Sequence, residues 1–342
     1  MSLKNLSAII KIPKFLRDKL KNKRINNIYN QFKKSLDLNE DFLVAVSGGP
    51  DSLALAFLAK VYSIEKKLKA KFYIVDHKLR PESTKEAKKV KKCLNKIFVN
   101  AQILTWKGRK TSKNIQSKAR EARYQLLKKK TKKTKIYNIL VGHHKDDLFE
   151  NFFIRMTRGS GLKGLISLDK KAKIDNINLL RPLLDQKKSD LVFISKVVFG
   201  FYIEDPSNVN EKYQRIKIRG FIKQLQKNGL DNNKFLKTIE NLKSSNKVID
   251  FYVNENLTKN SSFSEKSSKL FLNKLFFQQP HEVVFRSLSE SVRLIGKKYY
   301  SVRGKKLERL ISNFENNYPF KATLGGCIIE KINQTVIISQ EN

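Results

Sequence analysis

The sequence predicts an α/β fold, in which a parallel sheet is covered by helices on both faces and is followed by a helical linker and a small α+β C-terminal domain. Short runs that are apolar at every position alternate with segments of helical periodicity, which is typical of parallel strands buried between helices. The 342 residues suffice for a sizeable core and two domains. After about residue 228 the alternation gives way to a long helical pattern and then a hairpin pattern.

Four apolar runs are the predicted strands of the sheet, at residues 42–46, 71–77, 101–106 and 136–141. Residues 181–184 are expected to form a fifth strand or an extended segment. Helical patterns flank these runs at residues 26–39, 82–98, 114–133, 146–157, 187–199 and 211–226. Because ligands of parallel sheets bind at the carboxyl ends of the strands, we expect the residues that follow the strands to converge on one pocket. Those residues are Ser47, Asp76-His77 and Gly142-His143-His144.

The chain is expected to divide into three parts. Residues 254–268 are rich in Asn, Ser and Lys, which favours a linker that follows a helix at 231–252. Beyond it, helical patterns at 283–295 and 305–314 precede a terminal hairpin at 322–339. The expected parts are an α/β domain (1–228), a helical segment and linker (229–268) and a small C-terminal domain (269–342).

The net charge of +40 at pH 7 indicates a polyanionic partner, most simply a nucleic acid. AT-rich codons would also make Lys, Asn and Ile abundant, but they do not explain why Asp and Glu are so few. Cys93 and Cys327 are too few for a disulfide scaffold or a cysteine-ligated metal centre. No apolar run approaches the ~20 residues of a membrane span, and no signal peptide is recognisable, so a cytoplasmic location is expected.

The strand at 42–46 leads into the hexapeptide Ser47-Gly48-Gly49-Pro50-Asp51-Ser52. Gly48 and Gly49 allow a sharp turn and a close approach to a ligand, and Ser52 is expected to cap the helix that follows. Backbone N–H groups and the positive end of the helix dipole then favour a bound phosphate. Asp51 would repel a phosphate unless a cation lay between them, so we infer Mg²⁺ at Asp51.

Two similar motifs are excluded for this hexapeptide. It has no lysine, which a Walker A loop requires, and it lacks the Gly-x-Ser-x-Gly core of a serine elbow. An ordinary strand–turn–helix with small turn residues is the plainer alternative. The hexapeptide resembles the loop of the ATP pyrophosphatases (the PP-loop enzymes, whose fold is adenine nucleotide alpha hydrolase-like). That resemblance implies that it grips the pyrophosphate of ATP while a nucleophile attacks the α-phosphate.

A second cluster follows the strand at 136–141, where His143 and His144 precede a helix that carries Asp146, Asp147 and Glu150. Asp147 and Glu150 share a helix face, and Asp146 is placed to cap the helix. One interpretation is a metal such as zinc, although the spacing is not His-Glu-x-x-His. Another is a carboxylate pair that binds a cationic group and accepts a proton from it. The third is a capped helix with a solvated face.

The helix at 114–133 is strongly basic and places Gln116, Arg120 and Arg123 within one or two turns of each other. Guanidinium groups pair well with phosphates or with a base edge. A basic surface helix is the alternative, and it would be the simpler interpretation of a single arginine.

Taken in order, these motifs resemble the tRNA(Ile)-lysidine synthases, a family of the PP-loop superfamily. The resemblance is dense over residues 40–225 and weaker over residues 282–339, where the family carries a small tRNA-binding domain. It is made specific by Asp76-His77-Lys78-Leu79-Arg80-Pro81-Glu82-Ser83 and by His143-His144-Lys145-Asp146-Asp147. Further matches are Arg158-Gly159, Arg181-Pro182-Leu183-Leu184, and Asp205-Pro206-Ser207-Asn208 with Arg215 and Arg219.

The resemblance implies an ATP-dependent ligase that joins lysine to carbon 2 of the wobble cytidine in a CAU-anticodon isoleucine tRNA. The base is adenylated with release of pyrophosphate, lysine then displaces AMP, and codon reading changes from AUG to AUA. The implied cofactors are ATP and Mg²⁺, and the implied partners are this tRNA and free L-lysine. The sequence leaves the oligomeric state open, a homodimer included.

The resemblance also assigns roles to individual residues. Asp147 and Glu150, with His143, are the candidates for binding the lysine ammonium group and for catalysis. Arg120 is the candidate for the target nucleotide or the α-phosphate, and Arg123, Arg215 and Arg219 are further nucleotide or tRNA candidates. The ATP-binding residues are Ser47, Gly48, Gly49, Pro50, Asp51 and Ser52, with Asp51 on Mg²⁺.

The chain departs from the family pattern in two respects. Asn151 stands where the family usually has Thr, and the second C-terminal domain of longer relatives is expected to be absent. Two other functions are weighed against this one. A PP-loop synthetase that acts on a small metabolite would not need such a positive charge, and an RNA-binding protein with a decayed nucleotide fold would not need Asp51 and Ser52.

Overall fold

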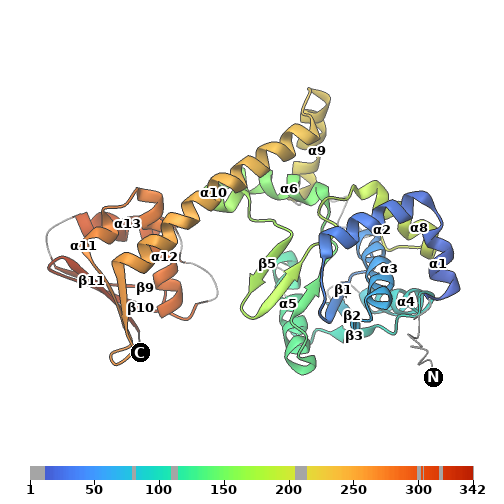
Figure 1. Cartoon of the computed structure of the whole chain (residues 1–342), viewed down its shortest axis with the longest axis horizontal. Helices are drawn as coiled ribbons and strands as arrows, with labels where there is room; N and C mark the ends of the chain where they lie inside the picture. The colour runs from blue at the N-terminus through green and yellow to red at the C-terminus, as the bar shows by residue number, and fades with distance from the viewer. Residues whose placement is uncertain are drawn as a thin grey trace, which may run out of the picture. The chain divides into compact units, whose positions relative to one another are not determined.

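The computed structural model describes residues 12–78, 82–108, 115–204, 214–298, 302, 304–315 and 319–341 (Figure 1). Contacts divide the chain into two compact units, Met1–Leu230 and Asp231–Asn342. Each unit has its own sheet and its own hydrophobic core. Within the described ranges, no helix has the length and apolarity that a bilayer-spanning segment needs.

A six-stranded sheet forms the centre of the N-terminal unit. Its strands are β1 (Phe42–Val46), β2 (Ala70–Asp76), β3 (Gln102–Thr105), β4 (Asn138–Leu140), β5 (Lys171–Ile174) and β6 (Ile177–Leu180). They lie in the order β3-β2-β1-β4-β6-β5, and only β5 runs antiparallel to its neighbour. The four predicted strands and the predicted fold class are confirmed.

Helices cover both faces of this sheet. The helices described in this unit are α1 (Lys14–Leu20), α2 (Lys23–Leu36), α3 (Pro50–Glu65), α4 (Ser83–Asn95), α5 (Ile115–Thr134), α6 (Lys145–Met156), α7 (Leu162–Leu165), α8 (Lys188–Phe199) and α9 (Gln214–Lys227). Along β1, Val44 and Val46 belong to the core cluster on the α3 side, and Leu43 belongs to the cluster that includes Leu127 of α5. The continuous apolar run of β1 is thereby explained, because successive side chains enter different cores.

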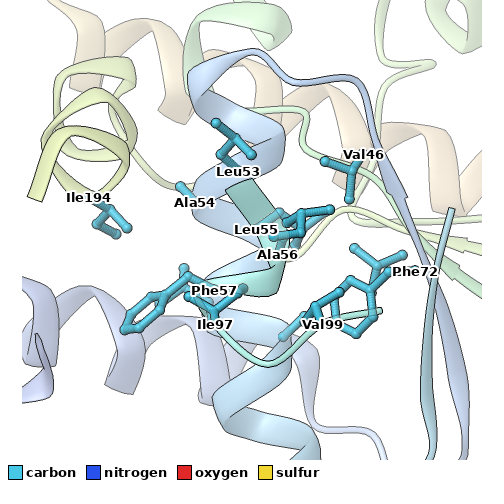
Figure 2. Packing of buried hydrophobic residues seen from close by; sticks show 14 of the residues in the cluster. Val46, Leu53, Ala54, Leu55, Ala56, Phe57, Phe72, Ile97, Val99 and Ile194 are labelled. Atoms are coloured by element: carbon cyan, nitrogen blue, oxygen red, sulfur yellow. The ribbon is translucent and has the colours of Figure 1, made fainter. Parts of the chain in front are cut away.

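The helix α3 is the most deeply buried helix segment beside the sheet. Its residues from Leu53 to Ala59 are 0% exposed. Figure 2 shows why: they lie between strand residues such as Val46 and Phe72 on one side and Ile194 of α8 on the other. This packing fixes the start of α3, and with it the turn between β1 and α3.

Two expectations about the N-terminal unit are wrong in detail. Residues 181–184 are not a strand: β6 ends at Leu180, Arg181 follows it, and a turn begins at Pro182. The hairpin of β5 and β6 was not foreseen, because the exposed residues of β5 alternate with half-buried ones at an edge and give little apolar signal.

The C-terminal unit packs four helices against an antiparallel sheet. The helices are α10 (Asn232–Asn260), α11 (Lys274–Phe277), α12 (His281–Ile295) and α13 (Gly304–Glu315). The strands are β7 (Ser261–Ser264), β8 (Lys269–Leu272), β9 (Phe320–Leu324), β10 (Cys327–Ile332) and β11 (Thr335–Gln340), in the order β7-β8-β11-β10-β9. The predicted terminal hairpin is confirmed as β10 and β11, which turn at Asn333-Gln334.

The expected linker at 254–268 is instead the end of α10 and the β7–β8 hairpin. The prediction was wrong because asparagines of this segment are buried and hydrogen-bonded inside the unit. The Asn256 side chain is 2% exposed and donates to the carbonyl of Phe276 at 3.2 Å and to Ser287 Oγ at 3.3 Å. Asn260 in turn donates to Asn256 Oδ1 at 2.9 Å. Buried amides with satisfied hydrogen bonds look like loop residues in a sequence.

Candidate active site

The turn after β1 requires glycine at position 48 on two grounds. Gly48 has a φ of +94°, in the left-handed region that side chains disfavour. A Cβ there would lie 2.5 Å from Val90 Cγ2 and 2.9 Å from Ile203 Cδ1. The Gly48 carbonyl also accepts a hydrogen bond from the Ile203 N–H at 2.9 Å. The segment that follows α8 therefore holds this turn in place through a backbone hydrogen bond.

Ser52 organises the turn rather than capping the helix. The helix α3 begins at Pro50 with Gly49 as its N-cap, so the expected cap at Ser52 is wrong. Ser52 Oγ accepts from the N–H groups of Ser47 at 3.1 Å and Gly48 at 3.0 Å, and it donates to the Gly49 carbonyl at 3.0 Å. These hydrogen bonds hold the loop in shape before any ligand binds. The first-turn N–H groups of Asp51 and Ser52 have no intrahelical acceptor, so they and the helix dipole are the anion-binding end.

The segment after β4 passes close to this loop. A Cβ on Gly142 would lie 3.1 Å from the Asp51 carbonyl atoms and 3.2 Å from the Ser52 nitrogen, which is tighter than nearly all real contacts. Gly142 thus lets the two strand ends approach each other. The predicted convergence of the ends of β1 and β4 is confirmed.

The Asp51 carboxylate is held in the loop with one oxygen free of protein partners. Its Oδ1 is buried and, among the described residues, has no hydrogen-bond partner, while Oδ2 lies 3.6 Å from His144 Nε2. Burial raises the pKa of Asp51, and the neighbouring His144 and Lys188 oppose that rise. An unpartnered buried carboxylate oxygen beside a phosphate-binding helix end fits Mg²⁺. No group of three or more His, Cys, Asp or Glu in the described chain is arranged to hold a metal, so phosphate oxygens would complete such a site.

His144, not Asp146, is the N-cap of α6. Its Nδ1 accepts from the Asp146 N–H at 3.3 Å, and its own N–H donates to Asp147 Oδ2 at 2.9 Å, which completes a capping box. The expectation that Asp146 caps this helix is therefore wrong. A histidine ring at an N-cap was not anticipated because Asp, Asn, Ser and Thr are the usual residues there.

Asp147, like Asp51, lies close to Nε2 of the His144 ring. Its Oδ2 is 3.7 Å from His144 Nε2. Burial alone would raise the pKa of Asp147, but His144, His143 and the His144 N–H together lower it. The pKa values of the two neighbouring carboxylates are thus shifted in opposite directions, and the lowered pKa keeps Asp147 ionised at pH 7.

Glu150 is paired with Arg219 of α9. The carboxylate is 4% exposed and meets Arg219 in a two-pronged pair, with Nε–Oε1 at 2.5 Å and Nη2–Oε2 at 3.3 Å. A fork of this kind is the strongest geometry for an arginine–carboxylate pair. Glu150 is therefore engaged in this structure, and a second cation would share or replace Arg219.

His143 points away from His144 and towards Arg181. Arg181 Nε donates to His143 Nδ1 at 3.3 Å, and Arg181 Nη1 donates to the Asp169 carbonyl at 2.6 Å. Burial is the main reason why the pKa of His143 falls to about 3. The charge of Asp147 opposes this fall, and the charge of Arg181 adds to it. His143 is thus a neutral ring at pH 7. Because the two histidines face different partners, they do not form a zinc site.

Three of the predicted arginines influence one another electrostatically. Burial lowers the pKa of Arg123, and the charges of Arg120 and Arg215 lower it further, whereas Tyr124 opposes the fall. In the part of the chain that is described, no carboxylate forms an ion pair with Arg123. His77 Nδ1, at the end of β2, is buried without a partner in the same described part. Crowded cations without counter-ions call for an anionic ligand.

Comparison with known proteins places this site in a family. Residues 18–226 match the PP-loop domain family. A tRNA(Ile)-lysidine synthase of Wolbachia pipientis wMel is 33% identical over 318 residues, which cover 92% of this chain and 73% of the relative. A tRNA(Ile)-lysidine synthase of Orientia tsutsugamushi (strain Boryong) is 33% identical over 319 residues, which cover 89% of this chain and 70% of the relative. The chain belongs to the tRNA(Ile)-lysidine synthase family.

A solved structure supports the fold of this tRNA(Ile)-lysidine synthase family member at a greater distance. The U34-tRNA thiolase NcsA from Methanococcus maripaludis superposes with a TM-score of 0.55 at 17% identity, over 65% of this chain and 79% of its own. At that identity the likeness concerns the fold alone.

Some predicted residues of this family member lie outside the described ranges. They are Leu79-Arg80-Pro81, Asn114, and Asp205-Pro206-Ser207-Asn208, and the side chain of Gln116 is likewise not described. Asp76, expected in the pocket, has a structural role instead. Its carboxylate accepts from the hydroxyls of Ser83 at 2.8 Å and Thr84 at 2.7 Å and so holds the start of α4.

The sequence pointed to His144 and Arg181 but not to the roles that they have in the site, and it gave no indication of Lys188. His144 faces Asp51, Arg181 donates to His143, and the charge of Lys188 opposes the rise in the pKa of Asp51. A signal existed for Arg181, since a charged residue directly after an apolar strand sits at the carboxyl end of the sheet. No comparable signal existed for Lys188, one lysine among many in a very basic chain.

Proposed function

We propose that this chain joins lysine to the wobble cytidine of a CAU-anticodon isoleucine tRNA at the expense of ATP, and so changes codon reading from AUG to AUA. Membership of the tRNA(Ile)-lysidine synthase family supports the reaction class. The observation that carries the proposal is that Asp51 and Asp147 both lie within 4 Å of the same atom, His144 Nε2. The phosphate-binding end and the candidate amine-binding end thereby share one site.

The first step makes cytosine carbon 2 reactive. Its carbonyl oxygen attacks the α-phosphate of ATP, and the bond to pyrophosphate breaks. The turn from Ser47 to Ser52 binds the departing pyrophosphate with its free N–H groups and the positive end of α3. Asp51 would hold Mg²⁺, which neutralises charge on the phosphates. The loop is already ordered by Ser52, so little rearrangement is needed when ATP binds.

The second step needs a neutral amine. The ε-amine of lysine attacks carbon 2, a proton leaves the nitrogen, and AMP departs with the former carbonyl oxygen. Asp147, which stays ionised, is suited to bind the incoming ammonium group and to orient it. Glu150 is the second candidate for this group, although Arg219 engages it in the structure described here.

The arginine cluster suits the RNA part of the substrate. The charges of Arg120 and Arg215 act on Arg123, for which no carboxylate appears among the causes of its pKa shift. An RNA phosphate would neutralise this charge, and guanidinium forks also bind base edges. A base in an anticodon loop must turn out of its stack to reach such a site. The C-terminal unit, whose sheet and helices form a separate compact body, is proposed to bind the remaining tRNA.

The test is a ligation assay with the full chain. Purified protein, Mg-ATP, labelled lysine and a CAU-anticodon isoleucine tRNA transcript are combined, and tRNA-bound label and AMP are followed together. We expect equal amounts of both products. AMP without label would retain the adenylating loop and reject lysine as the amine. Folded protein that binds the tRNA and forms neither product would reject the ligase function and favour a binding protein.

A further inference from the structure

His144 lies at the boundary between the two halves of the site, and neither step described above gives its ring a role. The side chain is 4% exposed. Its Nδ1 accepts a hydrogen bond from the Asp146 N–H at 3.3 Å. A ring nitrogen that accepts carries no proton, so the proton of the neutral ring is on Nε2. The cap of α6 thus fixes which nitrogen of His144 is the donor.

That donor faces two carboxylates at nearly equal distances. Nε2 lies 3.6 Å from Asp51 Oδ2 and 3.7 Å from Asp147 Oδ2. Two partly buried carboxylates near one atom repel each other, and an N–H dipole that faces both reduces that repulsion. Asp147 Oδ2 also accepts from the His144 backbone N–H at 2.9 Å. One residue therefore donates to Asp147 through its backbone N–H and faces both Asp147 and Asp51 with its ring.

The two carboxylate oxygens of Asp51 have different surroundings. Oδ2 faces His144, whereas Oδ1 is buried and has no partner in the described part of the chain. If the ring were absent, both oxygens could swing in the space beside the loop. With the ring in place, Oδ1 is the oxygen that remains for a cation.

We propose that His144 is a positioning residue, whose Nε2–H holds the carboxylates of Asp51 and Asp147 at a fixed spacing. This inference rests on the proposed function, in which Asp51 serves the ATP phosphates and Asp147 the amine. A ligase with two successive attacks on neighbouring atoms gains from such a fixed spacing, because both reactants must be oriented in one site. Residues that orient a metal-binding carboxylate typically affect metal affinity or activity by about 10–100-fold.

Two substitutions separate the two nitrogens of the ring. In His144→Asn the amide oxygen can replace Nδ1 as the acceptor that caps α6, but the side chain is too short to replace Nε2. In His144→Gln the amide reaches the region of Nε2, and the cap is lost. Asn is a strong N-cap residue, and losing a cap costs about 1 kcal/mol. We therefore expect His144→Asn to unfold near the wild-type temperature and His144→Gln to unfold earlier.

The activities are expected in the opposite order. Adenylation of the tRNA, measured as pyrophosphate release, should fall about 10–100-fold in kcat for His144→Asn, with the KM for tRNA unchanged. His144→Gln should retain more kcat than His144→Asn although it is less stable. A purely structural cap would give the reverse order. If His144→Asn equals or exceeds His144→Gln in kcat, the positioning role is overturned.

A binding measurement without tRNA or lysine separates this inference from the proposed function. Mg-ATP should raise the unfolding temperature of the wild type and of His144→Gln, and it should raise that of His144→Asn less. A wild-type protein that fails to transfer lysine would reject the proposed ligase but leave this comparison valid. Should His144→Gln fail to fold, His144→Asn decides alone: an unchanged Mg-ATP shift and an unchanged kcat overturn the proposal.

Discussion

At the scale of single residues, the site depends on groups that the fold leaves without partners. Asp51 Oδ1 and His77 Nδ1 are buried without hydrogen bonds from the described residues. Leaving such a group unsatisfied costs about 1–3 kcal/mol, so a folded protein tolerates it where a ligand supplies the missing bond. Both atoms follow strands that end at the same edge of the sheet. Their position agrees with a site that is complete only when ATP and RNA are bound.

Gly48→Ala is predicted to destabilise the protein by about 2 kcal/mol or more. The positive φ strains any residue with a Cβ, and that Cβ would meet Val90 and Ile203 well inside contact distance. Gly49→Ala is the matched control, because its nearest atom lies 4.0 Å away. Urea unfolding of both variants tests this. Equal stabilities for the two would refute the strain that we assign to position 48.

The pKa of His77 predicts a dependence of stability on pH. Burial, and then the charge of Arg123, lower the pKa of His77 from 6.5 to about 4, against the opposing charge of Asp76. Between those values the unfolded chain binds a proton that the folded chain does not. Stability should therefore fall as the pH drops from 6.5 towards 4.

The variant His77→Gln isolates this contribution. Its stability should decline less steeply than that of the wild type when urea unfolding is compared at pH 7 and pH 5. Parallel pH profiles for the two proteins would show that His77 is not buried in its neutral form.

At the scale of elements, α6 carries most of the site's chemistry from its first two turns. His144 caps it, Asp147 completes the capping box, and Glu150 joins it to α9 through Arg219. The capping box fixes where Asp147 points, and the ion pair fixes Glu150. The helix is thus anchored at its active end before any substrate binds.

Removing the arginine from this ion pair should be costly. Arg219→Ala leaves Glu150 buried without its partner, and we expect a loss of about 2–3 kcal/mol of stability, since Arg219 is itself 30% exposed. Arg215→Ala is the control, because Arg215 is an exposed residue one turn earlier on α9. Urea unfolding measures both variants. A similar, small loss for the two would show that the α6–α9 ion pair adds nothing to stability.

The sequence predicted the sheet and the loop well because their signals are local. Apolar runs gave β1 to β4, and the glycines with Asp51 gave the phosphate turn. The errors arose where tertiary contacts override local preference. Ser52 bonds backwards to Ser47 and Gly48 rather than capping α3, and Asn256 is a buried residue of a long helix. Nothing in the local pattern shows that Glu150 and Arg219, 69 positions apart, form a pair.

At the scale of the whole molecule, the charge of +40 and the division into two compact units both agree with a large polyanionic substrate. An active site for ATP and an amino acid needs few positive charges. We propose that the excess serves contacts to an RNA backbone.

Affinity for the tRNA should therefore fall steeply with salt. Each phosphate contact releases a counterion, so a protein with about 6–10 such contacts loses roughly 10³–10⁵ in affinity between 50 and 200 mM salt. Fluorescence anisotropy with a labelled transcript measures this slope. A flat response would contradict electrostatic RNA binding, and poly-anionic heparin serves as the competitor control.

The most direct test of the central claim follows AMP when lysine is left out. The account predicts that ATP and tRNA alone give adenylated tRNA and pyrophosphate, and that added lysine then releases AMP. Asp147→Asn keeps an oxygen that can accept from the His144 backbone N–H. This variant should adenylate the tRNA but transfer little lysine, whereas Asp51→Asn should fail at both steps. Pyrophosphate release that depends on lysine and occurs without tRNA would contradict the account, because the amino acid rather than the base would then attack ATP.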